Sequence, residues 1–297
     1  MTQYTAADMA DYLRQWVLDA RPEEIATDEL VTTNQSLHAF ADDQALRFAL
    51  TASLIPPAAP GQILIEIGSA PYLMSLIFAH RLGYTVRHTN LTHDSRLNPP
   101  IVMRNDRSKV AASIEWDELN VEFDKFPYSD NYADVLSCCE VIEHLTLNPV
   151  NMLGEIHRVL KPGGLLALTT PNALRDAHFR DLSRGRNIHD RYRKDFVFGA
   201  YGRHNREFTP SELCELLEHN GFTVQKCFTA DIYPDRRPLA MRLEDWWIKI
   251  PQRVRALFNR RKDARLDMKG DLIFIAAAKT GRFAEHYPTS IFYPPGE

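Results

Sequence analysis

The sequence predicts an α/β fold in which a mostly parallel β-sheet carries helices on both faces. Three observations support this. The apolar run 62–67 shows no polar alternation, which is typical of a strand buried on both faces of a parallel sheet. A helical stretch, 72–82, and a second strand, 84–90, follow directly and complete a strand–helix–strand unit. Alternating strand and helix patterns then continue toward the C-terminus.

Composition limits the possible classes of protein. The chain has 297 residues, 44% of them hydrophobic, and a formal net charge of −4, so we expect no nucleic-acid partner. No apolar run approaches the roughly 20 residues of a membrane span, and the first residues lack the apolar core of a signal peptide. The four cysteines show no CxxC spacing, so we expect reduced thiols in a cytoplasmic protein.

The first half of the chain divides at a breaker rich in proline, 56–61. Residues 1–55 are predicted to form an amphipathic, helical N-terminal extension. The core domain is expected over 56–235. Its third strand is expected at 119–122, whereas residues 92–117 carry no clear pattern.

The next elements have clear local signals. Residues 133–139 are predicted as the fourth strand, 149–160 as a helix and 165–170 as the fifth strand. The Lys-Pro-Gly-Gly sequence at 161–164 favours a turn, because proline presets φ and glycine permits positive φ. A further helix is predicted to begin at Thr209, with Pro210 in its first turn and Glu212 completing a capping box.

The C-terminal part contains two strand patterns, 222–232 and 271–278, separated by a basic helical insertion, 236–269. Apolar residues recur at helical spacing in this insertion. It could pack by its apolar stripe with a solvated basic face, or lie on an anionic membrane surface. Residues 270–297 are expected to form the last strand and a tail.

A ligand is expected where the first strand ends, because open α/β sheets bind ligands at the carboxyl ends of their strands. Glu66 and Gly68 stand at this position, and a glycine lets the backbone approach a ligand closely. The GxGxxG fingerprint of dinucleotide binding is absent, which argues against a nicotinamide-dependent oxidoreductase. A ligand without a pyrophosphate could use a looser turn.

Several sequence blocks follow in a fixed order. They are Phe-Pro-Tyr-Ser-Asp-Asn at 126–131, Ala-Asp-Val-Leu at 133–136, Glu-Val-Ile-Glu-His-Leu at 140–145, Glu-Ile-His-Arg-Val-Leu-Lys-Pro-Gly-Gly at 155–164, and then His204, Arg206, Phe208, Thr209, Glu212, Leu213 and Asn-Gly-Phe at 220–222. With these blocks, residues 61–230 resemble the class I S-adenosylmethionine-dependent methyltransferases of the type 11 group. The resemblance implies a methyltransferase with a Rossmann-like, seven-stranded sheet whose last strand is antiparallel, and S-adenosyl-L-methionine as cofactor.

The resemblance also implies roles for single positions. Asn90 matches the residue that holds the ribose, and Glu122 with Phe123 matches the site near the adenine. The other implied cofactor-binding residues are Glu66, Gly68, Ser69 and Ala70 in the first loop, and Cys139 and Glu140 at the end of the fourth strand. Ala70 and Tyr72 replace two glycines of the family loop, and Asn90 replaces an acid. An inactive binding module with this fold therefore stays open as an alternative.

Methyl transfer to an alcohol needs a base, because the alcohol's pKa lies far above 7. His144 and Glu143, just after the fourth strand, are the candidate catalytic residues, and a histidine titrates near neutrality. Alternatively, His144 packs against the next helix and Glu143 is solvated. No ligand spacing demands a metal ion.

Residues 171–207 are rich in hydrogen-bond donors and are expected to form a lid over the acceptor. The candidate substrate-binding residues are Tyr201, Arg203, His204 and Arg206. Their polarity favours O-methylation of a polar small molecule or of a sugar or glycan. An ordinary charged surface loop, and a quinone, lipid or natural-product acceptor, stay open as alternatives.

Overall fold

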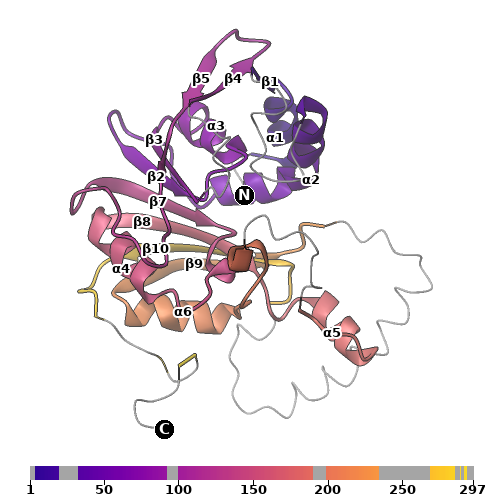
Figure 1. Cartoon of the computed structure of the whole chain (residues 1–297), viewed down its shortest axis with the longest axis vertical. Helices are drawn as coiled ribbons and strands as arrows, with labels where there is room; N and C mark the ends of the chain where they lie inside the picture. The colour runs from indigo at the N-terminus through magenta and orange to yellow at the C-terminus, as the bar shows by residue number, and fades with distance from the viewer. Residues whose placement is uncertain are drawn as a thin grey trace.

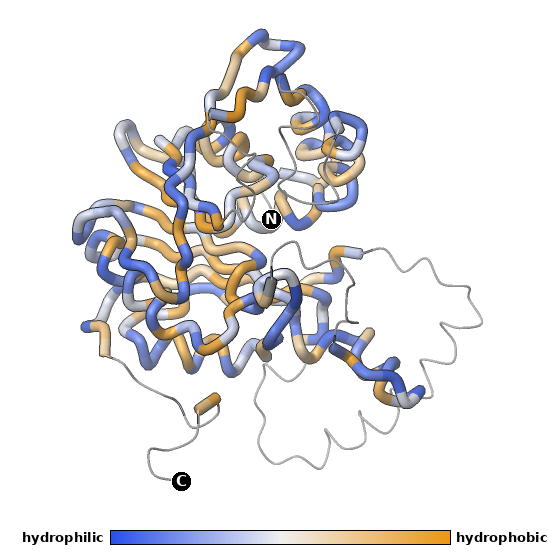
Figure 2. Tube along the Cα trace, in the orientation of Figure 1, coloured by the Kyte–Doolittle hydropathy of each residue, from blue (hydrophilic) through white to orange (hydrophobic). Residues whose placement is uncertain are grey.

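The computed structural model describes residues 4–19, 33–91, 100–189, 199–233, 268–284, 288, 291 and 292. These residues form a central sheet with helices on both of its faces (Figure 1). Figure 2 shows that the hydrophobic positions concentrate on the strands and on the helix sides that meet them. The described part of the chain therefore has the three layers that the sequence predicts.

The central sheet has seven strands, of which β10 alone runs antiparallel to the other six. In spatial order they are β6 (Trp116–Glu118), β3 (Thr85–Asn90), β2 (Ile63–Ile67), β7 (Ala133–Cys139), β8 (Leu160–Pro171), β10 (Leu272–Lys279) and β9 (Phe222–Ala230). The strand order reverses direction at β2, which lies between β3 and β7. This topology confirms the predicted Rossmann-like fold with an antiparallel last strand.

Two hydrophobic cores lie on opposite faces of the sheet. Helices α1 (Ala6–Leu13), α2 (Asn34–Ala52) and α3 (Leu73–His80) cover the first face. Helices α4 (Val150–Val159) and α6 (Pro210–His219) cover the second. Successive strand residues alternate between the two cores, as Leu64 and Ile65 do, because side chains of a strand point to opposite faces. Helix α5 (Asp176–Ser183) lies apart from both layers (Figure 1).

A small second sheet was not predicted. Strand β1 (Trp16–Leu18) pairs with β4 (Ile101–Asn105), which pairs with β5 (Ala111–Ile114). The prediction that 1–55 is wholly helical is therefore wrong at β1, whose three residues are too few to show a strand period. Trp16, the first residue of β1, is buried and packs on His80 of α3.

The third strand was predicted three residues too late. Residues 116–118 form β6, whereas 119–122 follow the strand as a turn. Leu119 and Val121 are buried, but they are buried at the carboxyl end of the sheet and not within a strand. Their alternating burial imitates a strand pattern, which explains the error.

The remaining predicted elements agree closely with the structure. The turn at 161–164 is an irregularity within β8, where the register with β7 shifts and Gly163 has a φ of +75°. Helix α6 begins with the predicted capping box, in which Thr209 accepts from the Glu212 amide and the Glu212 carboxylate accepts from the Thr209 amide. Pro210 occupies the first turn.

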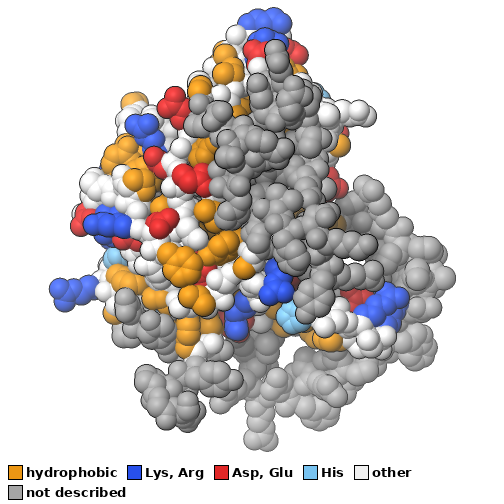
Figure 3. Space-filling model, in the orientation of Figure 1, with side chains coloured by type: hydrophobic (Ala, Val, Ile, Leu, Met, Phe, Trp, Pro, Cys, Tyr) orange, Lys and Arg blue, Asp and Glu red, His pale blue; other side chains and the backbone are white. Residues whose placement is uncertain are grey.

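The predicted basic insertion, 236–269, lies almost entirely outside the described residues, so its two alternatives stay predictions. In the described ranges, every helix is too short or too polar to cross a bilayer. On the face shown in Figure 3, acidic and basic side chains of the described residues are interspersed and form no large patch of one charge.

Tyr72 shapes the loop between β2 and α3. It has a φ of +67°, which a side chain other than glycine adopts at an energetic cost. Its ring is buried and stacks on Trp116 of β6, with the centroids 5.8 Å apart. Tyr72 therefore replaces the family's glycine with a side chain that fills the space between this loop and the sheet edge.

We expect Tyr72→Ala to lower the free energy of unfolding by about 3–5 kcal/mol, because the lost ring leaves a cavity under β6. Urea unfolding measures the change. Leu182→Ala, at an exposed side chain of α5, is the control and should change stability by less than about 0.5 kcal/mol. Equal effects of the two substitutions would contradict the packing role of Tyr72.

Candidate cofactor and active site

A cavity of about 130 Å³ opens at the carboxyl ends of β2, β3 and β7. This is the edge of the sheet where its strand order reverses, the usual ligand position in such folds. Its lining residues are Ile67, Gly68, Thr89, Asn90, Leu91, Leu119, Asn120, Val121, Glu140, Val141, His144, Leu145 and Tyr201. The predicted residues Gly68, Asn90, Glu140, His144 and Tyr201 thus come together from four separate segments.

Gly68 is required at its position for two reasons. Its φ of +66° is a conformation that glycine adopts at little cost. A Cβ atom at this residue would lie only 2.7 Å from Cγ2 of Val141. The missing side chain therefore keeps the floor of the cavity open.

The other predicted residues of this loop support the floor from below. Glu66 is buried and accepts a hydrogen bond from Ser75 of α3, and burial raises its pKa to about 8 against the opposing effect of that bond. The Ser69 hydroxyl donates to the Thr89 carbonyl over 3.3 Å and ties the loop to β3. Glu66, Ser69 and Ala70 are not among the lining residues, so their contact with a cofactor stays a prediction.

Glu122 anchors one wall of the cavity. Its carboxylate accepts hydrogen bonds from the backbone amides of Thr146, Leu147 and Asn148, from the Thr146 hydroxyl at 2.8 Å and from the Tyr201 hydroxyl at 2.9 Å. Burial by itself would raise the pKa of Glu122, but these donors outweigh it and hold the pKa below its usual value. Protein groups thus engage both oxygens, and the predicted adenine contact is not tested.

Asn120 and Tyr201 meet at the rim of the cavity. The Asn120 amide donates to the Tyr201 hydroxyl over 3.1 Å, and both side chains line the cavity. Asn120 was missed in the sequence because it was assigned to a strand. Phe123, predicted beside Glu122, is 58% exposed and is not among the lining residues.

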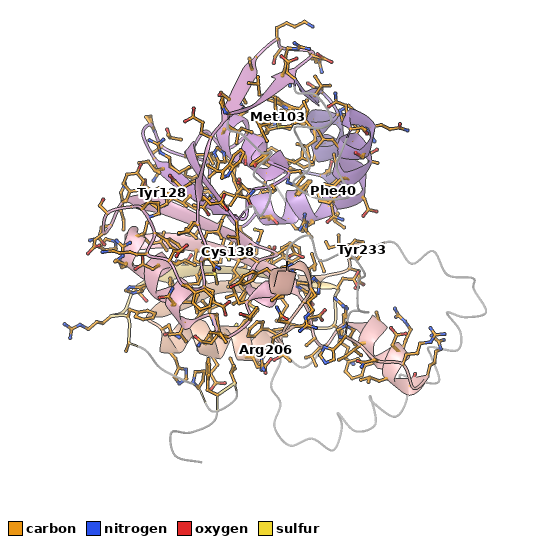
Figure 4. All side chains as sticks on the ribbon, in the orientation of Figure 1. Phe40, Met103, Tyr128, Cys138, Arg206 and Tyr233 are labelled. Atoms are coloured by element: carbon orange, nitrogen blue, oxygen red, sulfur yellow. The ribbon has the colours of Figure 1, made fainter. Side chains whose placement is uncertain are left out.

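Glu140 and Cys139 end strand β7. Glu140 has a φ of +55°, accepts from the Thr169 hydroxyl at 2.8 Å and lies 3.8 Å from Arg47 of α2. The N-terminal extension therefore places a cation beside the cavity. Cys139 lies behind the wall, and burial raises the pKa of its thiol to about 11, so it is a poor nucleophile. Its neighbour Cys138 lies within the central sheet (Figure 4).

A cluster of three titratable side chains borders the cavity. Glu143 and His144 belong to the 3₁₀ helix η2 (Ile142–His144), and His204 follows the 3₁₀ helix η3 (Gly199–Gly202). The two imidazole rings are 5.0 Å apart, and Nε2 of His144 lies 3.9 Å from Oε1 of Glu143. Burial, and then the nearby charge of Glu140, raise the pKa of Glu143 to about 8. All three residues are predicted from the sequence, but their contact is not.

The orientation of each histidine is set by an acceptor at Nδ1. Nδ1 of His144 lies 3.0 Å from the Arg203 carbonyl, which can only accept, so this nitrogen carries the proton. Nδ1 of His204 lies 3.2 Å from the carboxylate of Glu207, which also contacts Arg175. Glu207 lies in the polar segment 171–207, but its role of holding the His204 ring was not predicted from the sequence.

The remaining predicted lid residues have other contacts. Arg206 pairs with Glu212 at 2.9 Å and lies over the Phe208 ring, so its guanidinium is directed to α6 (Figure 4). The Arg203 side chain donates to Asn205 over 3.0 Å. Neither lines the cavity, and their predicted contact with an acceptor is not tested.

A larger open groove of about 640 Å³ lies elsewhere. It is lined by residues of α1, of the β4–β5 hairpin and of the C-terminal end of α3, including Trp16, His80 and Arg107. The C-terminal end of α3 is the end distant from Gly68, so this groove is not at the carboxyl edge of the sheet. Position and chemistry therefore favour the smaller cavity as the functional site.

The fold is that of the class I methyltransferases, and the comparison of sequences assigns the chain to this class. Residues 37–227 match a family described as a methyltransferase domain, and the chain belongs to this family. S-adenosyl-L-methionine is the cofactor of this class.

One sequence relative is an S-adenosylmethionine-dependent methyltransferase of Mycolicibacterium smegmatis, which is 36% identical over 101 residues. The matched segment covers 34% of this chain and only 33% of the relative. Among solved structures, a chain of the complex between the Haloferax volcanii Trm112 methyltransferase activator and a methyltransferase has a TM-score of 0.51 at 16% identity, over 83% of this chain and 96% of that one. A methyltransferase of Archaeoglobus fulgidus has a TM-score of 0.48 at 16% identity, over 80% and 94%.

The chemical character of the cavity residues matches this cofactor. The open floor at Gly68 admits a close ligand, and the Asn90 amide can donate to and accept from ribose hydroxyls. The cavity volume is below the roughly 300 Å³ at the lower end of small-molecule sites. We therefore expect rim side chains such as Tyr201 to move outward when a cofactor of this size binds.

We expect Gly68→Ala to weaken S-adenosylmethionine binding by 10-fold or more, because the new Cβ must displace Val141. Isothermal titration measures the affinity. Gly61→Ala is a matched control, since Gly61 also has a positive φ, +80°, but no atom lies within 4 Å of its added Cβ. If the two variants bind equally well, the assignment of Gly68 to the cofactor floor is wrong.

We expect Glu122→Gln to lower the free energy of unfolding by about 2 kcal/mol, because the amide NH₂ cannot accept from the donors around it. Urea unfolding at pH 7 measures the loss. Glu115→Gln, at an exposed residue of the same region, should be neutral. An equal stability of both variants would show that the carboxylate does not hold the wall.

Proposed function

We propose that this methyltransferase transfers the methyl group of S-adenosylmethionine to an oxygen atom of a polar acceptor, a small molecule or a sugar or glycan. The observation that supports this most strongly is the placement of Glu143, His144 and His204 beside the cofactor cavity. Basic nitrogens at this position can act on an acceptor hydroxyl, whereas a thioether acceptor carries no proton and would need no such group.

The bound cofactor would supply an electrophilic sulfonium methyl, to which the acceptor oxygen bonds as the carbon–sulfur bond breaks and S-adenosylhomocysteine leaves. The protein has to orient the acceptor, exclude water and supply a group that takes up the hydroxyl proton. His144 is suited to act on the hydroxyl, because the proton on Nδ1 is held by the Arg203 carbonyl and the lone pair of the neutral ring lies on Nε2.

The acceptor would lie between the cofactor cavity and the segment 199–207. This segment presents polar groups of Tyr201, Arg203 and His204, which match hydroxyl-rich molecules better than a lipid tail or a quinone ring. The four cysteines form no disulfide, which fits the proposed cytoplasmic location.

The first experiment is isothermal titration of the purified chain with S-adenosylmethionine and with S-adenosylhomocysteine. Micromolar binding of either supports the proposal, and transfer of a labelled methyl group to a panel of sugars and other polyols then identifies the acceptor class. Absence of binding to both would favour an inactive binding module. Transfer to amines but not to hydroxyl compounds would refute the proposed acceptor atom.

We expect His144→Ala to leave the affinity for S-adenosylmethionine within 3-fold and to lower kcat by about 10²-fold or more. Steady-state release of S-adenosylhomocysteine with a saturating acceptor measures kcat. An unchanged kcat would show that His144 has only a packing role.

A further inference from the structure

We propose that Glu143, His144 and His204 bind a divalent transition-metal ion at the acceptor side of the cofactor cavity. Two imidazole nitrogens and one carboxylate oxygen are a common ligand set for such ions in enzymes. Each of the three residues offers one ligand atom, and these atoms all lie within 4.8 Å of one another.

The geometry is close to that of a metal site. Two ligand atoms at about 2.1 Å from a tetrahedral ion lie roughly 3.4 Å apart. Oε1 of Glu143 and Nε2 of His144 are 3.9 Å apart. Side-chain rotation that closes the ligand-atom separations, at most 4.8 Å, by up to about 1.4 Å would bring the three atoms within bonding distance of one ion.

Both histidines are oriented as metal-binding histidines usually are. In such sites the second ring nitrogen donates to a carbonyl or carboxylate, which fixes the ring and its tautomer. Nδ1 of His144 has the Arg203 carbonyl at 3.0 Å, and Nδ1 of His204 has the Glu207 carboxylate at 3.2 Å. Nε2 is therefore the ligating nitrogen in both rings.

The buried carboxylate is an independent indication of a cation. The Glu143 side chain is fully buried, and its Oε2 accepts from the Thr170 hydroxyl at 2.9 Å. Among the described residues, no hydrogen-bond donor reaches Oε1, the oxygen that faces His144. A buried carboxylate oxygen is costly unless it is hydrogen-bonded, paired or bound to a metal, and an ion between the three residues would satisfy it.

The exposure of the ligands favours an open, catalytic type of site. The His144 and His204 side chains are 30% and 29% exposed, so three protein ligands would leave coordination positions accessible from solvent. Since His144 also lines the cofactor cavity, these positions face the proposed acceptor. Imidazole ligands favour zinc, iron, nickel or copper over magnesium, calcium or manganese, which prefer oxygen.

The catalytic consequence rests on the proposed function. A metal-bound hydroxyl has a lowered pKa, so an acceptor could lose its proton to solvent before its oxygen attacks. His144 would then serve as a ligand and not as the proton acceptor. Metal binding itself depends on neither the acceptor nor the cofactor, so it can be tested separately.

The test uses the full-length chain, treated with EDTA and dialysed, and titrates it with CoCl₂ while visible absorption is recorded. Isothermal titration with ZnCl₂ gives the affinity. Wild-type protein is compared with H204Q and E143Q, and with H219Q, whose histidine is exposed on α6 outside the cluster. Circular dichroism checks the fold, and titration with S-adenosylmethionine is run on the same samples.

We expect one equivalent of Co²⁺ with visible bands for wild type and H219Q, and an affinity at least 10-fold lower for H204Q and E143Q. If E143Q does not fold, H204Q decides, because its side chain is partly exposed. Absence of Co²⁺ and Zn²⁺ binding at 1:1 stoichiometry in the wild type, or equal binding by H204Q, would overturn the proposal. Metal binding without cofactor binding would instead count against the proposed function alone.

Discussion

Four hydrogen bonds between two segments that are 60 residues apart hold the candidate site together. The backbone amides of Asn205 and Arg206 both donate to the Glu143 carbonyl, at 2.8 and 3.1 Å. The Asn205 side chain donates to the His144 carbonyl over 2.8 Å, and the His144 ring donates back to the Arg203 carbonyl. These bonds satisfy the polar backbone of a short 3₁₀ helix that has few internal bonds of its own. Without them, His204 would have no reason to lie beside Glu143.

The cofactor side depends on a different constraint, the close approach of loops at the carboxyl edge of a parallel sheet. Because Gly68 has no Cβ atom, the Val141 side chain can pack against the loop without a clash. Tyr72 takes the position of a family glycine, but its ring packs away from this space. The ring of Tyr72 stacks on Trp116 at the sheet edge. Tyr72 is not among the residues that line the cavity. The altered loop is therefore a repacked version of the family loop, which removes one reason to suppose that the chain is an inactive module.

The sequence was sufficient for most of the fold. Buried parallel strands, the capping box at Thr209 and the Pro-Gly-Gly turn each have a local physical signal. Strand β1 could not be predicted, because three residues have no detectable period and its partner β4 lies far along the chain. The same limit applies to the site. His144 and His204 were each recognised as chemically suitable, but their contact depends on backbone hydrogen bonds that no spacing in the sequence encodes.

Glu122 illustrates a further limit of reasoning from a family pattern. The pattern identifies an acid at this position, and the acid is buried next to the cavity. Its oxygens, however, accept from three backbone amides and two hydroxyls, so its main structural effect is to fix residues 146–148 and Tyr201. Only the three-dimensional list of donors distinguishes a residue that contacts a ligand from one that builds the wall around it.

The short segment from Tyr201 to His204 connects the two halves of the site. Tyr201 contacts Glu122 and Asn120 at the rim of the cofactor cavity, and His204, three residues later, contacts His144 in the cluster. A shift of Tyr201 that admits a cofactor would thus act on the backbone that positions His204. Cofactor binding in the cavity would then change the free energy needed to order the Glu143–His144–His204 cluster. The size of this change would depend on how differently the segment is held with and without the cofactor. Any such coupling would act through the same four hydrogen bonds that assemble the cluster, because they attach the segment to η2.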